Sequence, residues 1–509
     1  MGLLALFVLW EYAARLDAGR FLLAGPVDIT AWLAANGGLM ARALGVTLHA
    51  AALGFLWGNL AAIALAVLLQ GLPRAAPAVS MLALLVFCLP LVATGPILRV
   101  LYGPGAGPQI TLAALAVYYT TFLSLRVGLR AVPASWTDLV ASYGRGPLAA
   151  LVHVRAMAAL PYLFAGLKIA APAAFLGAMI GEFTGAERGM GVLAIRAMRA
   201  LDLPATWALA SVAAATAMLA YAAVELAARL ARVDAPALLL APPAGRDRRP
   251  LWRRLSVAVG TGVLMLLIWQ GLMEGFALNR FFAKRPGDVW EFLVTSPAAS
   301  ANRATLLAAL GDTLVFALPG LLGGLGLGAL LACFLVLVPG LSPAILPVAV
   351  ALRSIPIVTT APLLVLAFGR GAVGTITIVA VMIFFPTLVA CLQGLQQAPG
   401  QIVDWMRSHA ASPLRILIHA RLPAMLPAFF ASARMAVPAA VLAVTTAEWL
   451  ATGRGIGALM ALTASTSNYN MLWSATAVLG LAATFGYGTV ALIEGAVLRR
   501  YAPEQVARA

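Results

Sequence analysis

Long apolar runs recur along the whole chain, and short polar or proline-containing segments separate them. Two examples are Leu44–Leu69 and Leu255–Met273. A helix needs about 20 mostly apolar residues to cross a bilayer, so the pattern predicts an all-α membrane protein with about 12 transmembrane helices. The predicted spans are 2–16, 44–70, 79–102, 108–132, 161–185 and 203–231 in the first half of the chain, and 255–274, 309–338, 343–368, 374–396, 427–451 and 471–498 in the second.

The pattern is duplicated. Shifting the sequence by 266 residues aligns the chain with itself without gaps over most of each half. Matched positions include Thr47 with Thr313, Gly54 with Gly320, Gly58 with Gly324, Pro90 with Pro356, Glu182 with Glu448, Gly191 with Gly457 and Trp207 with Trp473. Apolar composition alone does not place prolines, glycines and charges at one constant offset. We therefore predict two tandem six-helix repeats, a first domain at 1–231 and a second at 255–509, joined by a linker at 232–254.

The basic residues give the orientation of these repeats. The linker contains five arginines between positions 246 and 254, and short basic loops of membrane proteins face the cytoplasm. Six crossings separate matched spans, so both halves have the same orientation, as in parallel repeats. No basic cluster is interleaved with aromatic residues in a soluble segment, so we assign the net charge of +16 to topology and expect no nucleic acid partner. Residues 1–16 lack a basic start and a small-residue cleavage site, and predict a short first span rather than a signal peptide.

The sequence lacks motifs for catalysis. A phosphate-binding loop needs a lysine followed by serine or threonine, whereas Lys168 and Lys284 precede isoleucine and arginine. The four histidines have no metal-ligand spacing, the three cysteines lie apart in apolar stretches, and no Gly-x-Ser-x-Gly elbow occurs. We expect no enzyme activity, no metal site and no cofactor in this chain.

Two matched loops, 133–161 and 399–427, separate the fourth and fifth spans of the halves. In each loop, residues at spacing i, i+3, i+4 and i+7 predict a short amphipathic helix. They are Trp136, Leu139, Val140 and Tyr143 in the first loop, and Ile402, Trp405, Met406 and His409 in the second. Such a helix either lies on the membrane surface or docks in a groove of a cytoplasmic partner. Its duplication at matched positions favours docking.

These loops resemble the signature of the permease subunits of bacterial binding-protein-dependent ABC importers of the type I fold. The signature is Glu-Ala-Ala, three residues, Gly, nine residues, Ile, one residue and Leu-Pro. Its positions are held by Asp138, Leu139, Val140, Gly144, Val154 and Ala156-Met157 in the first loop, and by Asp404, Trp405, Met406, Ala410, Ala420 and Leu422-Pro423 in the second. A further Leu-Pro pair, ending at Pro161 or Pro427, is expected to begin each fifth span.

The stretches that follow the loops extend the resemblance. GLKIAAPAAFLGAMIGEFTGAERGMGVL (166–193) and SARMAVPAAVLAVTTAEWLATGRGIGAL (432–459) resemble the fifth span of the nitrate/sulfonate/taurine branch, in which a Glu near the span end precedes Gly-x-Gly. The resemblance implies two fused permease domains in the bacterial inner membrane. It implies two cytoplasmic ATPase subunits that use ATP and a periplasmic or lipid-anchored solute-binding protein. The solute it implies is a small anion such as nitrate, a sulfonate or taurine; relatives with this pattern are also associated with thiamine-precursor-like heterocycles.

Polar residues inside spans need an explanation, since a charge at the bilayer centre costs about 2.5–3.5 kcal/mol. Glu182 and Glu448 either pair with an arginine or reach the interface, or they take part in gating. Arg353 has no charged counterpart in the first half, and it either attracts an anionic solute or pairs with an acid. Thr94 and Thr360 either line the solute path or bond to a carbonyl of their own helix.

Two other classes of membrane protein also fit twelve spans. A secondary transporter commonly has two parallel six-helix halves. The major facilitator type is expected to carry a charged motif between its second and third spans, whereas these loops read GLPRAAPA (71–78) and VPGLSPA (338–344). A membrane scaffold that transports nothing is the third possibility. The translocation subunit of an ABC importer, embedded in the lipid bilayer, is the function that the sequence favours.

Overall fold

The computed structural model describes residues 2–501 except 17–22, 104, 234–250, 343–344, 346–367 and 370. Every regular element in these residues is a helix. The first half contains α1 (Gly2–Leu16), α2 (Pro26–Gly71), α3 (Ala76–Phe87), α4 (Leu91–Tyr102), α5 (Gly107–Arg130), α6 (Ala134–Ser142), α7 (Pro147–Ala150), the π-helical turn η1 (Leu151–Arg155), α8 (Ala156–Phe183), α9 (Met190–Arg199) and α10 (Leu203–Leu230).

From α16 onward the second half repeats this order, and its α-helices begin at the offset of 266 residues found in the sequence or one residue from it, whereas α11 and α13 begin at other offsets. Its elements are α11 (Leu251–Gly275), α12 (Pro286–Trp290), η2 (Glu291–Thr295), α13 (Ala299–Leu337), η3 (Pro339–Leu341), α16 (Ala372–Gln396), α17 (Gly400–Ser408), α18 (Pro413–Ile416), η4 (Leu417–Arg421), α19 (Leu422–Ala447), η5 (Glu448–Thr452), α20 (Gly455–Ser465) and α21 (Tyr469–Tyr501). The π-helical turns η1 and η4 occur at equivalent positions, which shows that the repeat extends to local backbone geometry.

The described part of the chain contains nine helices that are long and apolar enough to span a membrane. A tenth span is formed if α3 and α4 are counted together. The helix α1, at 15 residues, is shorter than a full span, and the predicted span 343–368 lies almost entirely outside the described residues. An all-α membrane protein with tandem repeats is therefore confirmed, while the count in the described residues is nine or ten.

The predicted third span, 79–102, is not one helix. The chain bends by 89° between α3 and α4, and Pro90 at the bend has an extended backbone (φ −69°, ψ 114°). Proline has no amide hydrogen to continue the helix of the preceding residues, so the helix ends before it. Hydropathy is continuous across this break, and for that reason the sequence pattern predicted a single span.

The predicted starts of the second and fifth spans need correction in both halves. The second spans begin at Pro26 rather than 44, because α2 continues through a kink at Asn36, and at Ala299 rather than 309. The fifth spans begin at Ala156 and Leu422, so Pro161 and Pro427 lie inside α8 and α19 instead of beginning them. Of the prolines in these Leu-Pro pairs, only Pro423 stands in a first helical turn.

Small residues bring α2 against α5, and α13 against α16. A Cβ on Gly54 would lie 2.3 Å from the Cβ of Ala113, and one on Gly320 would lie 2.6 Å from the Cβ of Val379. Gly58 and Gly324 face a backbone carbonyl of the neighbouring helix in the same way, each at 2.6 Å. Membrane helices associate through such close approaches, because lipid supplies no hydrophobic drive for packing. The matched glycines of the sequence are thus matched helix contacts.

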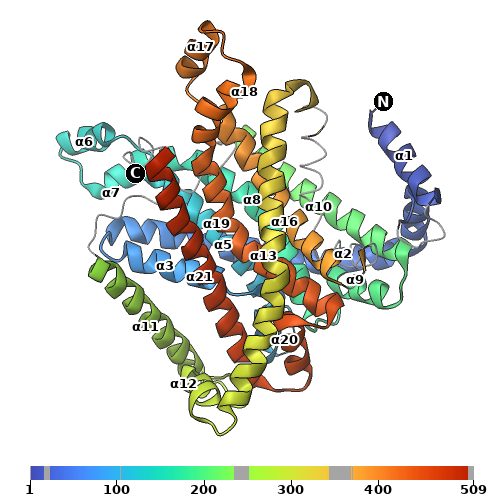
Figure 1. Ribbon diagram of the computed structural model, residues 1–509. Coiled ribbons are helices and arrows are strands. Elements are labelled where there is room, and N and C mark those ends of the chain that lie inside the picture. The colour runs from blue at the N-terminus through green and yellow to red at the C-terminus, as the bar shows by residue number, and fades with distance from the viewer. Residues whose placement is uncertain are drawn as a thin grey trace.

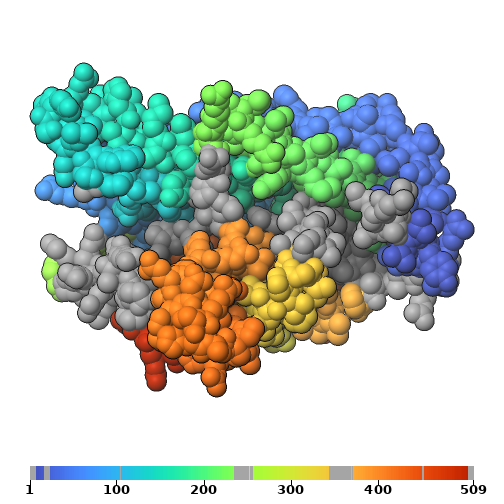
Figure 2. Space-filling view, turned by 90° about the horizontal axis from the view of Figure 1, so that it is seen from above, coloured from blue at the N-terminus to red at the C-terminus, as the bar shows by residue number. Residues whose placement is uncertain are grey.

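The two halves meet at α3 and α4. These helices contact α11, α19, α20 and α21 of the second half. One buried cluster joins Val92 and Ile180 of the first half to Ile378, Ala440 and Val444 of the second. The α6–α7 and α17–α18 regions both lie towards the upper side of the molecule, whereas α12 and α20 lie at its lower end (Figure 1). Seen from above, both loop regions face the viewer, as expected for parallel repeats (Figure 2).

Candidate functional site

The helices α6 and α17 carry large apolar side chains that the described part of the chain leaves more than half exposed. Trp136, Leu139 and Tyr143 of the first loop are 55%, 58% and 78% exposed. Their counterparts Trp405 and His409 are also exposed, and their rings lie 4.5 Å apart between centroids. We call these two surfaces the first and second aromatic faces.

The other residues predicted for the two docking loops differ in exposure. Asp138 and Asp404 are exposed, Val140 and Met406 are half-buried, and Ile402 is 48% exposed. Leu422 and Pro423 are half-buried at the start of α19. The amphipathic helices predicted from the sequence therefore exist, with most of their large apolar side chains turned away from the protein.

Each loop helix ends in the same turn. Gly144 and Ala410 have a left-handed backbone, with φ of +70° and +54°. The amide of the following residue, Arg145 or Ala411, donates to the carbonyl of Val140 or Met406, which closes the end of the helix. The loop glycine of the signature is thus a helix-ending residue, and in the second loop an alanine takes the same strained conformation.

We expect Gly144→Ala to destabilise α6 and Ala410→Gly to stabilise α17, each by about 1 kcal/mol, because a Cβ is unfavourable in the left-handed region. Nothing lies within 4 Å of a Cβ added to Gly144, so its effect is confined to the backbone. Hydrogen exchange of the loop amides measures both changes. A control, Gly37→Ala, which also meets no neighbour within 4 Å, leaves exchange in both loops unchanged.

The π-helical turns η1 and η4 join each loop to its fifth span. Nδ1 of His153 lies 3.1 Å from the carbonyl oxygen of Ala149, and Nδ1 of His419 lies 3.0 Å from that of Arg415. Arg155 donates to Oε1 of Gln70 at 2.9 Å, which ties the first turn to the end of α2. The matched histidines therefore make the same contact within their own turn.

A buried carboxylate organises the far end of each fifth span. Oε1 of Glu182 accepts from the hydroxyl of Thr47 at 2.7 Å, and its Oε2 accepts from the amide of Gly191 at 2.7 Å. The amide of Met190 donates to Oγ1 of Thr47 at 2.9 Å. We call these four residues the first carboxylate network. It fixes the N-terminus of α9 against α2, and the carboxylate sits where the helix dipole favours negative charge.

The second half contains the same network. The hydroxyl of Thr313 and the amide of Gly457 donate to Oε2 of Glu448 at 3.0 and 2.8 Å, and the amide of Ile456 donates to Thr313 at 2.8 Å. Glu182 and Glu448 are each 1% exposed. Among the described residues, the partners of each glutamate are a threonine hydroxyl and a backbone amide, and no arginine pairs with either glutamate.

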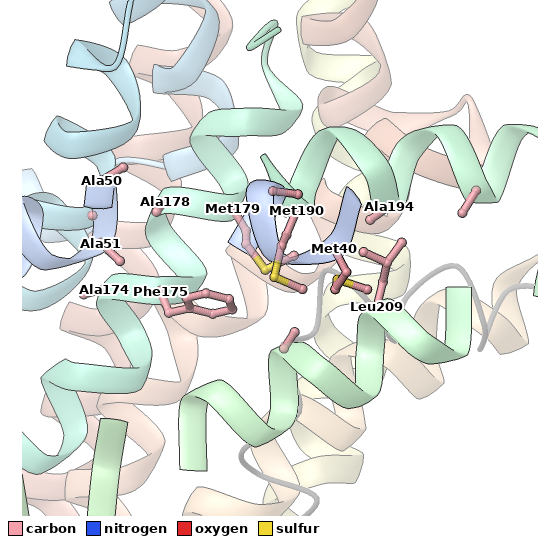
Figure 3. Close-up of a cluster of buried hydrophobic side chains, with 14 of the residues drawn as sticks. Met40, Ala50, Ala51, Ala174, Phe175, Ala178, Met179, Met190, Ala194 and Leu209 are labelled. Atoms are coloured by element: carbon pink, nitrogen blue, oxygen red, sulfur yellow. The ribbon is translucent and has the colours of Figure 1, made fainter. Parts of the chain in front are cut away.

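The glycines that follow each glutamate make room for its carboxylate. A Cβ on Gly189 would lie 2.2 Å from Cδ of Glu182, and one on Gly455 would lie 2.1 Å from Oε1 of Glu448. Both glycines also have positive φ. Between the glycines of the first network, Met190 points into a cluster with Met40, Met179 and Leu209 (Figure 3). The Gly-x-Gly after the fifth span is thus explained by the carboxylate that it encloses.

We expect Thr47→Val to lower stability by about 1–3 kcal/mol, because it leaves the buried Met190 amide without an acceptor and Oε1 of Glu182 without a donor. Thr313→Val is expected to cost less, since Oε2 of Glu448 keeps the Gly457 amide. Thermal unfolding of the purified variants measures the difference, and Thr30→Val, at an exposed threonine, is the control. A loss no larger than that of the control would contradict the network's role.

Thr94 is the remaining candidate for the solute path that the structure describes. The hydroxyl of Thr94 donates to the carbonyl of Pro90 at 2.9 Å, so it makes the local bond within its own turn. Arg353 and Thr360 lie outside the described residues. If Arg353 attracts the solute, Arg353→Met lowers uptake at normal expression.

Two ion pairs between the fifth and sixth spans were missed from the sequence. Lys168 pairs with Glu225 in the first half, and Nε of Arg434 lies 3.1 Å from Oε2 of Glu494 in the second. The guanidinium carbon of Arg434 also lies 6.0 Å from the centre of the Tyr487 ring. The signal was present, because Lys168 and Arg434 occupy matched positions and each last span contains a glutamate.

A family model matches the chain twice. The model for the binding-protein-dependent transport system inner membrane component matches residues 54–232 and 324–502. The two matches lie one in each repeat. Together they cover more than half of the chain, and each contains a loop helix and the carboxylate of one network.

Individual relatives match about half of the chain. A probable ABC transporter permease protein of Haemophilus influenzae is 32% identical over 45% of this chain and 90% of its own length. The riboflavin transport system permease protein of Chloroflexus aurantiacus is 26% identical over 52% of this chain and 97% of its own. The formylaminopyrimidine transport permease protein of Halalkalibacterium halodurans is 26% identical over 44% of this chain and 89% of its own. No solved structure matches the chain.

Proposed function

The chain belongs to the inner membrane components of binding-protein-dependent transport systems, and we propose that it supplies both permease halves of one ABC importer in a single polypeptide. Relatives that align over nearly their whole length cover only about half of this chain, which supports one permease unit in each half. The importer would lie in the bacterial inner membrane and receive its solute from a periplasmic or lipid-anchored solute-binding protein.

The two aromatic faces carry this proposal. They occupy equivalent positions, they are exposed, and both loop regions turn to one side of the molecule. A short helix with an exposed aromatic face suits insertion into a groove on a partner. Two such helices suit two ATPase subunits, and ATP hydrolysis by those subunits would drive the two halves between inward-open and outward-open arrangements.

The solute is proposed to be small and polar, and two chemical classes compete. The anion hypothesis depends on Arg353, which lies outside the described residues. The heterocycle hypothesis has support from two relatives whose names specify riboflavin and formylaminopyrimidine, while another relative is the taurine transport system permease protein of Escherichia coli. Titration calorimetry of the solute-binding protein encoded beside this chain, with taurine and with a formylaminopyrimidine, distinguishes the two classes of solute.

The proposal is tested by reconstituting the full chain in liposomes with the ATPase and the binding protein encoded beside it. We expect solute uptake that requires ATP and the binding protein. Deleting 133–160 or 399–423 is expected to impair copurification of the ATPase, and the two deletions are expected to impair it unequally. Uptake driven by a proton or sodium gradient, without any ATPase, would instead identify a secondary transporter.

A further inference from the structure

Two arginines near the C-terminal end of α5 lie on one face of that helix. Arg126 and Arg130 have the spacing i, i+4, at which side chains are neighbours on a helix surface. Arg130 is exposed, whereas Arg126 is half-buried one turn farther into the span, and the two positive charges are close enough to repel. Two like charges at this spacing destabilise a helix, so an anion beside them would be stabilising.

The structure places no carboxylate beside this pair. Nη1 of Arg126 donates to the hydroxyl of Ser80 on α3, and the guanidinium carbon lies 5.6 Å from the centre of the Phe122 ring. The ion pairs within the described ranges include neither Arg126 nor Arg130. A guanidinium has several N–H donors, and the single Ser80 hydroxyl leaves most of those on Arg126 for an acceptor from outside the chain.

The pair faces α3, which lies at an outer edge of the molecule. In Figure 1, α3 is at the left edge, below α6 and α7 and above α11. Because α5 ends at Arg130 and α6 begins at Ala134, both arginines are at the end of the molecule that carries the first aromatic face. Arg74, exposed in the turn before α3, and Arg155, which bonds to Gln70, add positive charge at the same end.

This concentration of arginines is specific to the first half. At the offset of 266 residues, the positions of Arg74, Arg126 and Arg130 are occupied by Gly340, Leu392 and Gln396. The second half has its basic residues at this end in the loop outside the span, for example at Arg407 and Arg415, where they are exposed. Loop arginines suffice for orientation, whereas a charge inside a span is costly and needs a separate explanation.

The phosphate group of an anionic phospholipid suits this position. The planar guanidinium of arginine binds two phosphate oxygens at once, and basic pockets between membrane helices hold anionic head groups. Arg126 lies between two helices within the last turns of the span, so a lipid of the adjacent leaflet can reach it from the side. A soluble partner would meet only the exposed Arg130.

We propose that Arg126 and Arg130 bind the phosphate group of one anionic phospholipid between α3 and α5, at the end of the molecule that carries the aromatic faces. The site depends neither on the identity of the solute nor on docking of an ATPase.

The test uses the full chain, purified in a neutral detergent and delipidated, with native mass spectrometry as the measurement. Phosphatidylglycerol is titrated, and phosphatidylcholine, whose choline cation neutralises its phosphate, is the comparison. We expect one phosphatidylglycerol molecule to be retained in preference to phosphatidylcholine. Arg126→Leu with Arg130→Gln, which introduces the second-half residues, is expected to weaken this binding by about tenfold or more. Arg130→Gln alone, at an exposed residue, is expected to weaken it by a smaller factor.

A matched variant separates this site from general surface charge. Arg196→Leu with Arg199→Ser also replaces two first-half arginines by their second-half counterparts, on the exposed side of α9, which follows the other end of the fifth span. It is expected to leave phosphatidylglycerol binding unchanged. Thermal unfolding without lipid shows whether each variant is folded.

Three results would overturn the proposal: equal retention of the two lipids, phosphatidylglycerol binding that neither Arg126→Leu with Arg130→Gln nor Arg130→Gln weakens, or an equal loss in the α9 variant. Thermal unfolding also tests the source of the phosphate. If inorganic phosphate stabilises the delipidated chain as much as phosphatidylglycerol does, at equal ionic strength, the site binds free phosphate and the lipid assignment is wrong. Weaker ATPase binding by the double variant, with lipid binding unchanged, would assign the two arginines to that partner instead.

Discussion

Replacing Trp405 by alanine is expected to weaken ATPase binding by about 2 kcal/mol or more, roughly thirtyfold, and Trp136→Ala is expected to weaken it less. Exposed tryptophans at the centre of an interface often carry a large share of binding energy. The second face has the firmer support, because Val403 of α17 packs against Ile416 and Ala420. None of the described side chains of α6 is buried. A face that is already ordered loses less entropy on binding.

Binding of the purified ATPase to the chain in nanodiscs measures this difference, with ATP-driven uptake as a second reading. Trp57→Ala is the matched control, since Trp57 is 60% exposed on the apolar helix α2, away from both loops. Equal losses for Trp136→Ala and Trp405→Ala would contradict the unequal roles of the faces. Unchanged binding for both variants would contradict docking altogether and favour a helix that lies on the membrane surface.

Removing one partner of the Arg434–Glu494 pair is expected to destabilise the protein by about 3–5 kcal/mol, because breaking a buried ion pair from one side costs the attraction but keeps the remaining charge buried. The two side chains are 8% and 0% exposed. Replacing both at once, as Arg434→Met with Glu494→Leu, is expected to cost far less than either single change, since no uncompensated charge remains.

Thermal unfolding of the two single variants and the double variant forms the test. The first-half pair is the control: Lys168 and Glu225 are 14% and 29% exposed, and Glu225 also bonds to Arg229. Lys168→Met is therefore expected to cause a smaller loss than Arg434→Met. A double variant as unstable as the worse single variant would show that the pair does more than balance charge.

Much of the architecture follows from two features of the sequence. Apolar runs locate the membrane helices, because a helix needs about 20 mostly apolar residues to cross the bilayer. The constant offset then identifies helix contacts. A glycine that recurs at the matched position, as Gly54 does at Gly320, indicates a close approach of two helices. The break at Pro90 could not be obtained this way, because hydropathy is continuous across it and a proline inside an apolar run either kinks or ends a helix.

For the candidate sites, too, local features could be predicted from the sequence and contacts between distant residues could not. The aromatic faces were predicted because the spacing of Trp136 and Leu139 is a local property of one helix. The partner of Glu182 was not, because Thr47 lies on another helix and a hydroxyl contact across 135 residues leaves no periodic signal. The offset did match Thr47 with Thr313 and Glu182 with Glu448, so correlated recurrence of two polar residues in apolar spans was the signal available.

The acid of the buried ion pair lies at different places in the two last spans, at Glu225 and at Glu494, and the position equivalent to Glu494 is Ala228. In a pore assembled from two identical chains, every substitution would appear twice, once on each side of the symmetry axis. A fused chain encodes its two repeats separately. One repeat can therefore acquire a new charge or lose a side chain while the other keeps the original, so the two repeats can diverge within a single gene.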